Sequence, residues 1–182
     1  MSIIDKVVAA VTPLESEEAR RSARASARQA ANEAPWLGRV LDHHQQIEEA
    51  FAAVKEAGDA NGRRRAQKWL GTLLTGHSLA EEAVLYPAMA LGDQKGHATA
   101  AYSEQSGAKI NLAALETLDP MSQEYLGKLE HVRGAVAHHV YEEESKWFPA
   151  LASQGGAALQ MRLSSRYTEE FDRYMGADAA GL

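Results

Sequence analysis

The sequence predicts an all-α protein: an up-down-up-down four-helix bundle with an N-terminal helical extension and an additional C-terminal helix. Three observations support this prediction. Alanine is abundant and only five prolines occur in 182 residues, a composition that favours helix over strand. Apolar residues recur at helical spacing in four consecutive stretches. Short turn-forming segments separate these stretches, as expected for antiparallel neighbours in a bundle.

Residues 1–35 are expected to form the extension. Its first stretch has apolar residues at helical spacing and ends at Pro13. A second helix can begin at Ser16, whose side chain can cap it and which two glutamates follow at the positive helix end. Residues 19–34 carry almost no large apolar side chains, so this helix lies on a surface or projects into solvent. It is either a peripheral appendage or, through residues 14–34, a binding site for a protein partner.

Residues 36–152 are expected to form the bundle, with four amphipathic helices. The first begins at Trp36 and ends near Gly58, where turn-forming residues follow. The other three are expected to end at prolines, because proline interrupts the backbone hydrogen bonds of a helix. These ends are Pro87, Asp119-Pro120 and Pro149. Residues 153–182 contain a further amphipathic helix after Gly155-Gly156, which we expect to pack across the bundle.

Composition excludes several classes of function. The chain has no cysteine, which rules out disulfides, thiolate zinc sites, iron–sulfur clusters and cysteine nucleophiles. The net charge of −6 argues against nonspecific binding to nucleic acid. The one basic cluster, Arg63-Arg64-Arg65, is better explained as a solvated helix start than as an anion contact. No apolar run reaches the roughly 20 residues that span a bilayer, and the N-terminus lacks a signal cleavage site. We therefore expect a cytoplasmic protein with no membrane segment.

A repeated motif indicates a metal site. Residues 77–88, HSLAEEAVLYPA, align without a gap with residues 139–150, HVYEEESKWFPA. A histidine and a glutamate four residues apart share one helix face, with Cβ atoms roughly 5–6 Å apart, so both can reach one ion. Both His-Glu pairs fall inside the apolar stripes of their helices. Since uncompensated core carboxylates cost several kcal/mol, a cation is the natural compensation. The alternative is a core His–Glu hydrogen-bond network without metal.

The first bundle helix supplies a third histidine. His44 lies in the apolar stripe, so its imidazole should face the core, whereas His43 points about 100° round the helix. We expect His43 to be solvated or to contact a ligand from outside. Glu48 completes another His-x-x-x-Glu pattern and is either a rim residue or a further ligand. Glu82 and Glu144, next to the proposed ligands, are expected to orient ligands or to face solvent.

These motifs resemble the hemerythrin-like, or HHE cation-binding, family. The resemblance covers about residues 36–152 and rests on Asp42-His43-His44 and on the two repeats with their aromatic-Pro ends. It implies a four-helix bundle with a non-haem di-iron centre bridged by two carboxylates. One iron position would be open for dioxygen, peroxide or nitric oxide. Carried over to this sequence, the implied metal ligands are His44, His77, Glu81, His139 and Glu143.

The sequence departs from the family pattern on the third bundle helix, where Gln105 stands in place of the usual histidine. A glutamine carbonyl is a weaker donor toward iron than an imidazole. His97 lies too far along the helix to replace it. Tyr102, one turn before Gln105, and Glu48 are further candidates for the position. The metal content therefore has alternatives: two irons are favoured, while one ion, manganese or zinc would also suit such ligands.

Three functions follow as hypotheses. The favoured one is a metal protein that binds dioxygen, nitric oxide or peroxide for sensing, scavenging or storage. The missing histidine suggests a second, an enzyme that turns over peroxide or another oxidant, because an additional open position favours reactivity. The polar helix of residues 16–34 suggests a third, a regulatory or interaction bundle with a structural metal.

Overall fold

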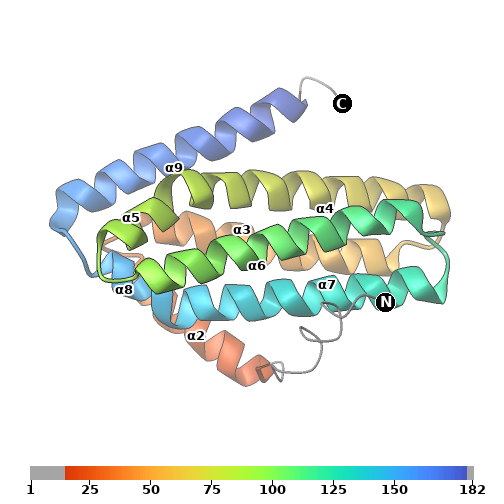
Figure 1. Ribbon diagram of the computed structural model, residues 1–182, viewed down its shortest axis with the longest axis horizontal. Helices are drawn as coiled ribbons and strands as arrows, with labels where there is room; N and C mark the ends of the chain where they lie inside the picture. Colours follow the sequence, from red (N-terminus) through yellow and green to blue (C-terminus); the bar gives the residue numbers. More distant parts are fainter. Residues whose placement is uncertain (1–14, 180–182) are drawn as a thin grey trace.

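Four long helices form the body of the molecule (Figure 1). The computed structural model describes residues 15–179, and within this range it contains helices and no strand. The long helices are α3 (Pro35–Glu56), α4 (Ala60–Ala80), α6 (Lys95–Ala114) and α7 (Gln123–Glu142). Helix α3 packs on α4 and α7, and α6 packs on the same two helices, so the four enclose one core. The predicted all-α bundle is confirmed.

Two more helices cover the bundle from outside (Figure 1). Helix α2 (Glu17–Ala30) lies against α3 and α7, and α9 (Gly156–Ala179) crosses α3 and α4. Ser16 caps α2 as expected, because its side chain accepts a hydrogen bond from the backbone N–H of Ala19 at 3.1 Å. The apolar stretch expected before Pro13 lies outside the described residues. The proposed boundaries between extension, bundle and C-terminal helix stay a prediction.

The chain stays helical past Pro87 and Pro149, where the second and fourth bundle helices were expected to end. Helices α4 and α7 each pass into a π-helical turn, η1 (Glu81–Leu85) and η3 (Glu143–Trp147) respectively. A short helix follows each turn, α5 (Tyr86–Leu91) after η1 and α8 (Phe148–Ala152) after η3. Each proline thus lies in the first turn of a new α-helix, where its missing N–H costs no hydrogen bond. The two copies of the repeated motif therefore adopt the same backbone conformation, a π-turn followed by a short helix.

The remaining connections are short. A 3-10 turn, η2 (Leu115–Thr117), directly follows α6 and leads into the loop before α7. Between α8 and α9, Gly155 and Gly156 have φ angles of 69° and 60°. Two successive residues in this left-handed region reverse the chain sharply, and glycine adopts it without steric cost. This reversal turns α9 back over the bundle.

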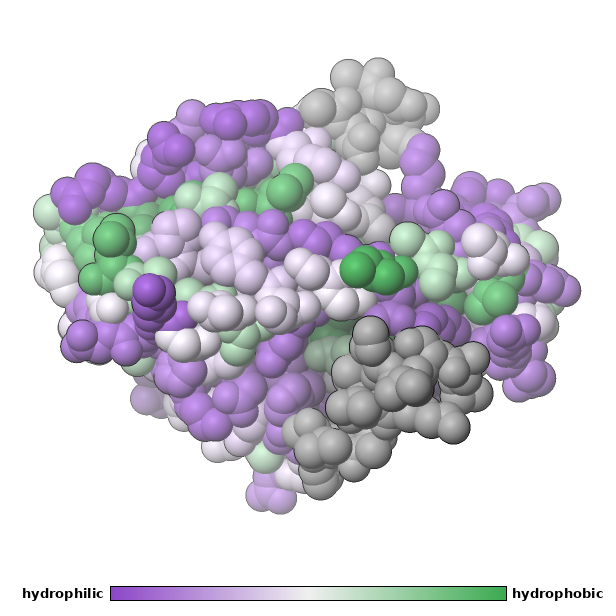
Figure 2. All heavy atoms as spheres, in the orientation of Figure 1, coloured by the Kyte–Doolittle hydropathy of each residue, from purple (hydrophilic) through white to green (hydrophobic). Residues whose placement is uncertain are grey.

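Hydrophilic side chains make up most of the face in Figure 2, and the hydrophobic ones lie in separate small areas. None of the described helices combines the length and the apolar character that crossing a bilayer requires. Inside, the apolar stripes meet in one core, except that Tyr102 remains 38% exposed.

Arg63 is buried, so the expectation of a fully solvated basic cluster is wrong. Its guanidinium donates to the backbone carbonyls of Val54, Lys55 and Ala57 at distances of 3.0, 3.1 and 2.7 Å. It also donates to the carbonyl of Pro120 at 2.7 Å. The last carbonyls of a helix have no partner within it. Arg63 therefore closes the end of α3 and joins it to the loop before α7.

Arg63→Ala is expected to lower the free energy of unfolding by about 3 kcal/mol, because several buried carbonyls lose a charged donor. Urea denaturation followed by circular dichroism measures the change. Arg65→Ala is the matched control, since Arg65 is exposed, and should shift stability by less than about 0.5 kcal/mol. Equal effects of the two substitutions would contradict a structural role for Arg63.

Candidate metal centre

Four buried polar side chains converge inside the bundle. They are His44 on α3, His77 on α4, Glu81 in η1 and Glu143 in η3. One ligand atom from each lies within 4.8 Å of the corresponding atoms of the others. Each of these residues is at most 2% exposed. The structure thus brings together four of the five residues predicted to hold a metal.

The fifth predicted residue, His139 on α7, joins the group through Glu143. Its Nε2 atom lies 3.2 Å from Glu143 Oε1, while the other carboxylate oxygen, Oε2, lies 3.3 Å from His44 Nε2. Glu81 is placed in the same way, with Oε2 at 3.2 Å from His77 Nε2 and Oε1 at 3.9 Å from His44 Nε2. Each carboxylate therefore stands between two imidazoles, an arrangement that suits a bridging ligand.

The inward atoms fit a metal ion. His44 Nε2, Glu81 Oε1 and Glu143 Oε2 are buried and have no hydrogen-bond partner among the described residues. Buried polar atoms of native proteins are almost always paired, because leaving them without a partner costs free energy. Imidazole nitrogens and carboxylate oxygens are suitable ligands for iron, manganese and zinc. A cation would satisfy these atoms and offset the two neighbouring carboxylates.

Each of the three histidines is held from behind through its Nδ1 atom. Such outer hydrogen bonds fix the ring orientation of a metal-binding histidine and leave Nε2 for the metal. The partners are Glu144 for His44 at 2.9 Å, Tyr167 for His77 at 3.1 Å and Glu104 for His139 at 2.8 Å. The three rings are therefore preorganised with Nε2 inward.

His43 is buried rather than solvated, and it shares a partner with His77. Its Nδ1 atom lies 2.9 Å from the Tyr167 hydroxyl, and its ring stacks on Phe171 with centroids 3.8 Å apart. The C-terminal helix α9 carries both Tyr167 and Phe171. Burial, helped by the positive charge of Arg39, lowers the pKa of His43 to about 4, so the ring is neutral at physiological pH.

Glu48 does not face the centre. Its side chain is 47% exposed and accepts from Arg24 of α2 at 2.8 Å. The same guanidinium donates to the buried Glu144 at 2.9 Å. Arg24 therefore connects α2 to the residue that orients His44. Glu82, the counterpart of Glu144 in the first repeat, instead pairs with Lys109 at 2.6 Å.

Two other oxygen-bearing side chains lie at the centre. Gln105 is buried and donates from Nε2 to Glu81 Oε2 at 2.5 Å, while its Oε1 has no partner among the described residues. The Tyr86 hydroxyl lies 2.8 Å from Glu143 Oε1 and 3.2 Å from Glu81 Oε2. Tyr102, by contrast, donates to the backbone carbonyl of Glu82 and stays outside the cluster.

Tyr86 was not predicted as a site residue, although the repeat contains a signal for it. The second repeat has Phe148 at the matching position, so only the first repeat carries a hydroxyl there. The π-turn explains its placement. The N–H of Tyr86 bonds the carbonyl of Glu81, five residues earlier, and the N–H of Phe148 bonds that of Glu143. In η1 the additional residue brings the Tyr86 ring back to the carboxylates of Glu81 and Glu143, and such turns are frequent at functional sites.

Protons balance the charges of the cluster when no metal is bound. Burial lowers the pKa of His44, but its contacts with Glu143 and Glu144 together outweigh burial and raise the pKa to about 9. Burial likewise lowers the pKa of His139, but Glu143, Glu104 and Glu81 together outweigh burial and raise the pKa to about 10. Burial raises the pKa of Glu143, but the two histidines outweigh it and hold the pKa low. Burial and the charge of Glu143 raise the pKa of Glu81 well above its ordinary value.

A small cavity lies beside the centre. Its volume is about 20 Å³, and His77, Gln105 and His139 form part of its wall. The rest is largely apolar, with Ile47, Leu74, Ala108, Val136 and Val140. A cavity needs roughly 10–15 Å³ to hold one water molecule. The space is therefore large enough for one water molecule or one diatomic molecule.

Tyr167→Phe is expected to weaken metal binding by about tenfold, because it removes the hydroxyl that holds His77 and changes no other atom. Competition with a chromophoric chelator measures the affinity. Tyr174→Phe on the same helix is the control, since it removes a hydroxyl far from the histidines' Nδ1 atoms. If both variants bind metal as tightly as the unmodified chain, the hydroxyl does not position His77.

Comparison with known proteins adds two findings. Residues 37–151 match the family model described as "Hemerythrin HHE cation binding domain". A protein named DNA nickase from Nostoc sp. (strain PCC 7120 / SAG 25.82 / UTEX 2576) is 29% identical over 131 residues. That match covers 70% of this chain and 34% of the relative, so the chain corresponds to about a third of that protein. No solved structure matches the chain.

Proposed function

The chain belongs to the hemerythrin HHE cation-binding family, and from this premise we propose that it is a non-haem iron protein that binds dioxygen, nitric oxide or peroxide for sensing, scavenging or storage. One observation carries the proposal: buried imidazole and carboxylate atoms that lack a hydrogen bond face one another beside a cavity for one small molecule. The cavity size favours a diatomic or peroxide ligand over a larger substrate.

The residues that would hold the metal are the three histidines and two carboxylates of the cluster. Because each carboxylate stands between two imidazoles, the set suits two ions better than one. Iron bound there would supply open coordination positions and a reversible change of oxidation state. Gln105 and Tyr86 offer the oxygen atoms that lie nearest to the position of the missing third-helix histidine.

The other residues of the centre would control protons and water. Burial and the charges of Glu143 and Glu81 raise the pKa of Tyr86 well above its ordinary value, so its hydroxyl keeps a proton at the carboxylate edge. The apolar wall of the small cavity keeps bulk water away. Tyr86 thus keeps a hydrogen-bond donor next to the two carboxylates, and the small cavity offers a largely apolar space beside His77 and His139.

Metal quantification on protein expressed in iron-supplemented medium tests this function, together with anomalous scattering from crystals. About two iron ions per chain are expected, with visible absorption that changes when the reduced protein meets dioxygen or nitric oxide. The control is a variant in which His44, Glu81 and His139 are all alanine. Iron, manganese and zinc contents no higher than those of this variant would overturn the proposal.

Peroxide turnover is a second candidate, favoured by Gln105 in place of a histidine. Gln105→His would fill the open position, so it should retain iron and slow peroxide decay several-fold. Gln123→His, on the exposed start of α7, is the control and should leave the rate unchanged. Decay no faster than with the same concentration of free iron would remove this candidate.

Partner binding through residues 14–34 stays a prediction, and so does a cytoplasmic location. The nicking activity in the relative's name belongs to a protein of which the match covers only 34%. The net charge of −6 gives this chain no general attraction to DNA, so cleavage of nucleic acid is not part of the proposed function.

A further inference from the structure

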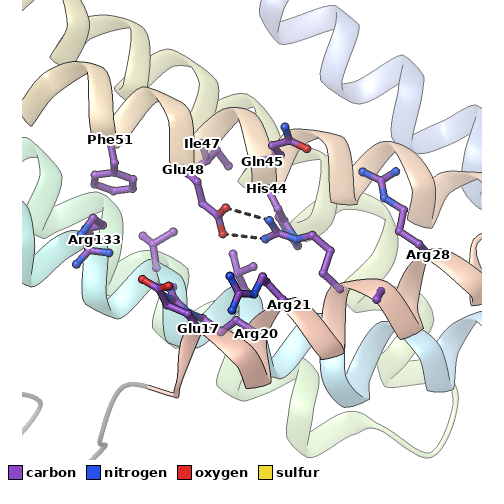
Figure 3. A pocket seen from close by; sticks show the side chains of 15 residues that line it. Glu17, Arg20, Arg21, Arg28, His44, Gln45, Ile47, Glu48, Phe51 and Arg133 are labelled. Carbon is purple, nitrogen blue, oxygen red and sulfur yellow. Dashed lines mark hydrogen bonds and ion pairs between the residues drawn. The ribbon is translucent and has the colours of Figure 1, made fainter. Parts of the chain in front are cut away.

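A second, larger cavity lies between α2, α3 and α7 (Figure 3). Its volume is about 580 Å³, within the usual range of roughly 300–1,000 Å³ for small-molecule sites. Ile47, Val136 and Val140 line both this cavity and the small one, whereas His44 is the one residue of the metal cluster in its wall.

The wall of this larger cavity has an apolar side and a cationic side. Helices α3 and α7 contribute the apolar side chains, which are Ile47, Phe51, Val136, Ala137 and Val140. Arginines line it mainly from α2, as Figure 3 shows for those it labels, and the set is Arg20, Arg21, Arg24, Arg28 and Arg133. Glu17 and Glu48 are the carboxylates in the wall, so arginines outnumber them although the whole chain is acidic.

Three of the arginines already have carboxylate partners. Arg24 binds Glu48 and Glu144, Arg28 binds Asp42, and Arg133 binds Glu130. The side chains of Arg20 and Arg21 form no hydrogen bond or ion pair with any residue from 15 to 179. Arg21 is exposed, whereas the Nε atom of Arg20 is buried without a partner. A buried donor of this kind calls for a ligand, because native structures rarely leave one unpaired.

We propose that this cavity binds an organic monocarboxylate with an apolar chain, of the class of medium-chain fatty acids. The carboxylate pairs with Arg20 and Arg21, since a guanidinium fork matches a carboxylate in geometry and charge. The chain lies along Ile47, Phe51 and Val136, where its burial is favourable. Glu17 and Glu48 in the same wall disfavour a polyanion such as a nucleotide. This site goes beyond the proposed function and does not rest on it.

Isothermal titration of the full-length chain with decanoate, below its micelle concentration, tests the proposal. Acetate carries the charge without the chain, and 1-decanol carries the chain without the charge, so both should bind at least about tenfold more weakly. The double variant Arg20→Ala/Arg21→Ala should weaken decanoate binding by about tenfold or more. Ala25→Trp keeps every charge but fills the cavity, and should also weaken it by about tenfold or more.

The matched control is Arg65→Ala/Arg162→Ala, which changes the net charge equally at two exposed positions outside the cavity. It should bind decanoate like the unmodified chain, and circular dichroism verifies that all variants are folded. Decanoate that does not bind at millimolar concentration overturns the proposal. So does equal weakening in the control pair, or unchanged binding in both cavity variants. Chain stripped of metal by a chelator should give the same affinity, which separates this test from that of the metal centre.

Discussion

Glu143→Gln is expected to abolish metal binding and to leave the bundle folded. The two oxygens of Glu143 lie near His139 and His44, and one also contacts the Tyr86 hydroxyl. Glu143 is also ionised, because the protonated His139 and His44 keep its pKa low. Loss of an outer-sphere residue costs about 10–100-fold in metal affinity, so loss of this central ligand should cost at least about 100-fold.

Metal content and a chelator competition measure the effect of this substitution. Glu142→Gln is the matched control, because the neighbouring Glu142 pairs outward with Lys146 at 3.0 Å. Thermal unfolding of the metal-free proteins shows whether the fold survives. NMR titration should also show the pKa values of His44 and His139 falling in the Glu143 variant. Metal bound as tightly by the Glu143 variant as by the control would rule out Glu143 as a ligand.

Metal affinity is expected to rise steeply between pH 6 and pH 8. His44 and His139 have pKa values of about 9 and 10 in the metal-free protein, so both carry protons in this interval. A metal must displace both protons, and each contributes about tenfold in affinity per pH unit. The two together give about 100-fold per unit. Glu81 makes metal affinity depend still more on pH, because its pKa is also raised and a metal must displace its proton as well.

The stability of the metal-free protein should have the opposite pH dependence. A histidine pKa raised on folding stabilises the fold fully below the unfolded value of about 6.5. That stabilisation is lost as the pH rises through about 9 and 10. Zinc affinity from chelator competition at pH 6, 7 and 8, with proton release from titrations in two buffers, tests the first statement. Urea denaturation of the metal-free protein between pH 6 and pH 10 tests the second. An affinity that changes less than about tenfold per pH unit would show that the histidines are not protonated together.

The bundle and most of the candidate centre could be predicted from the sequence, because helical periodicity determines which residues lie on the same face of a helix. His77 with Glu81, and His139 with Glu143, are four residues apart inside apolar stripes, so their inward orientation follows from one helix alone. His44 follows in the same way. These predictions needed no knowledge of how the helices pack.

Contacts between helices could not be predicted, because their relative rotation is set only by the packed core. Tyr167 and Glu104 reach the histidines from α9 and α6, and no spacing along the sequence links them. Arg63 was expected in solvent because the carbonyls that it satisfies belong to another helix and a loop. Tyr86 was not predicted for a different reason. It follows Glu81 by five residues, and residues at this spacing lie on different faces of a regular α-helix. The π-turn brings them onto the same face.

The two π-turns also limit how far this protein could be idealised by design. Deleting one residue from η1 or η3 would restore regular α-helical hydrogen bonding, a change that ordinarily improves a helix. In η1 it would also rotate Tyr86 by about 100° away from the carboxylates that its hydroxyl contacts. The same deletion would place the following proline inside a continuous helix, where it clashes. Selection for a stable helix and selection for a working centre therefore oppose each other at these two turns, and a stabilised redesign should leave both intact.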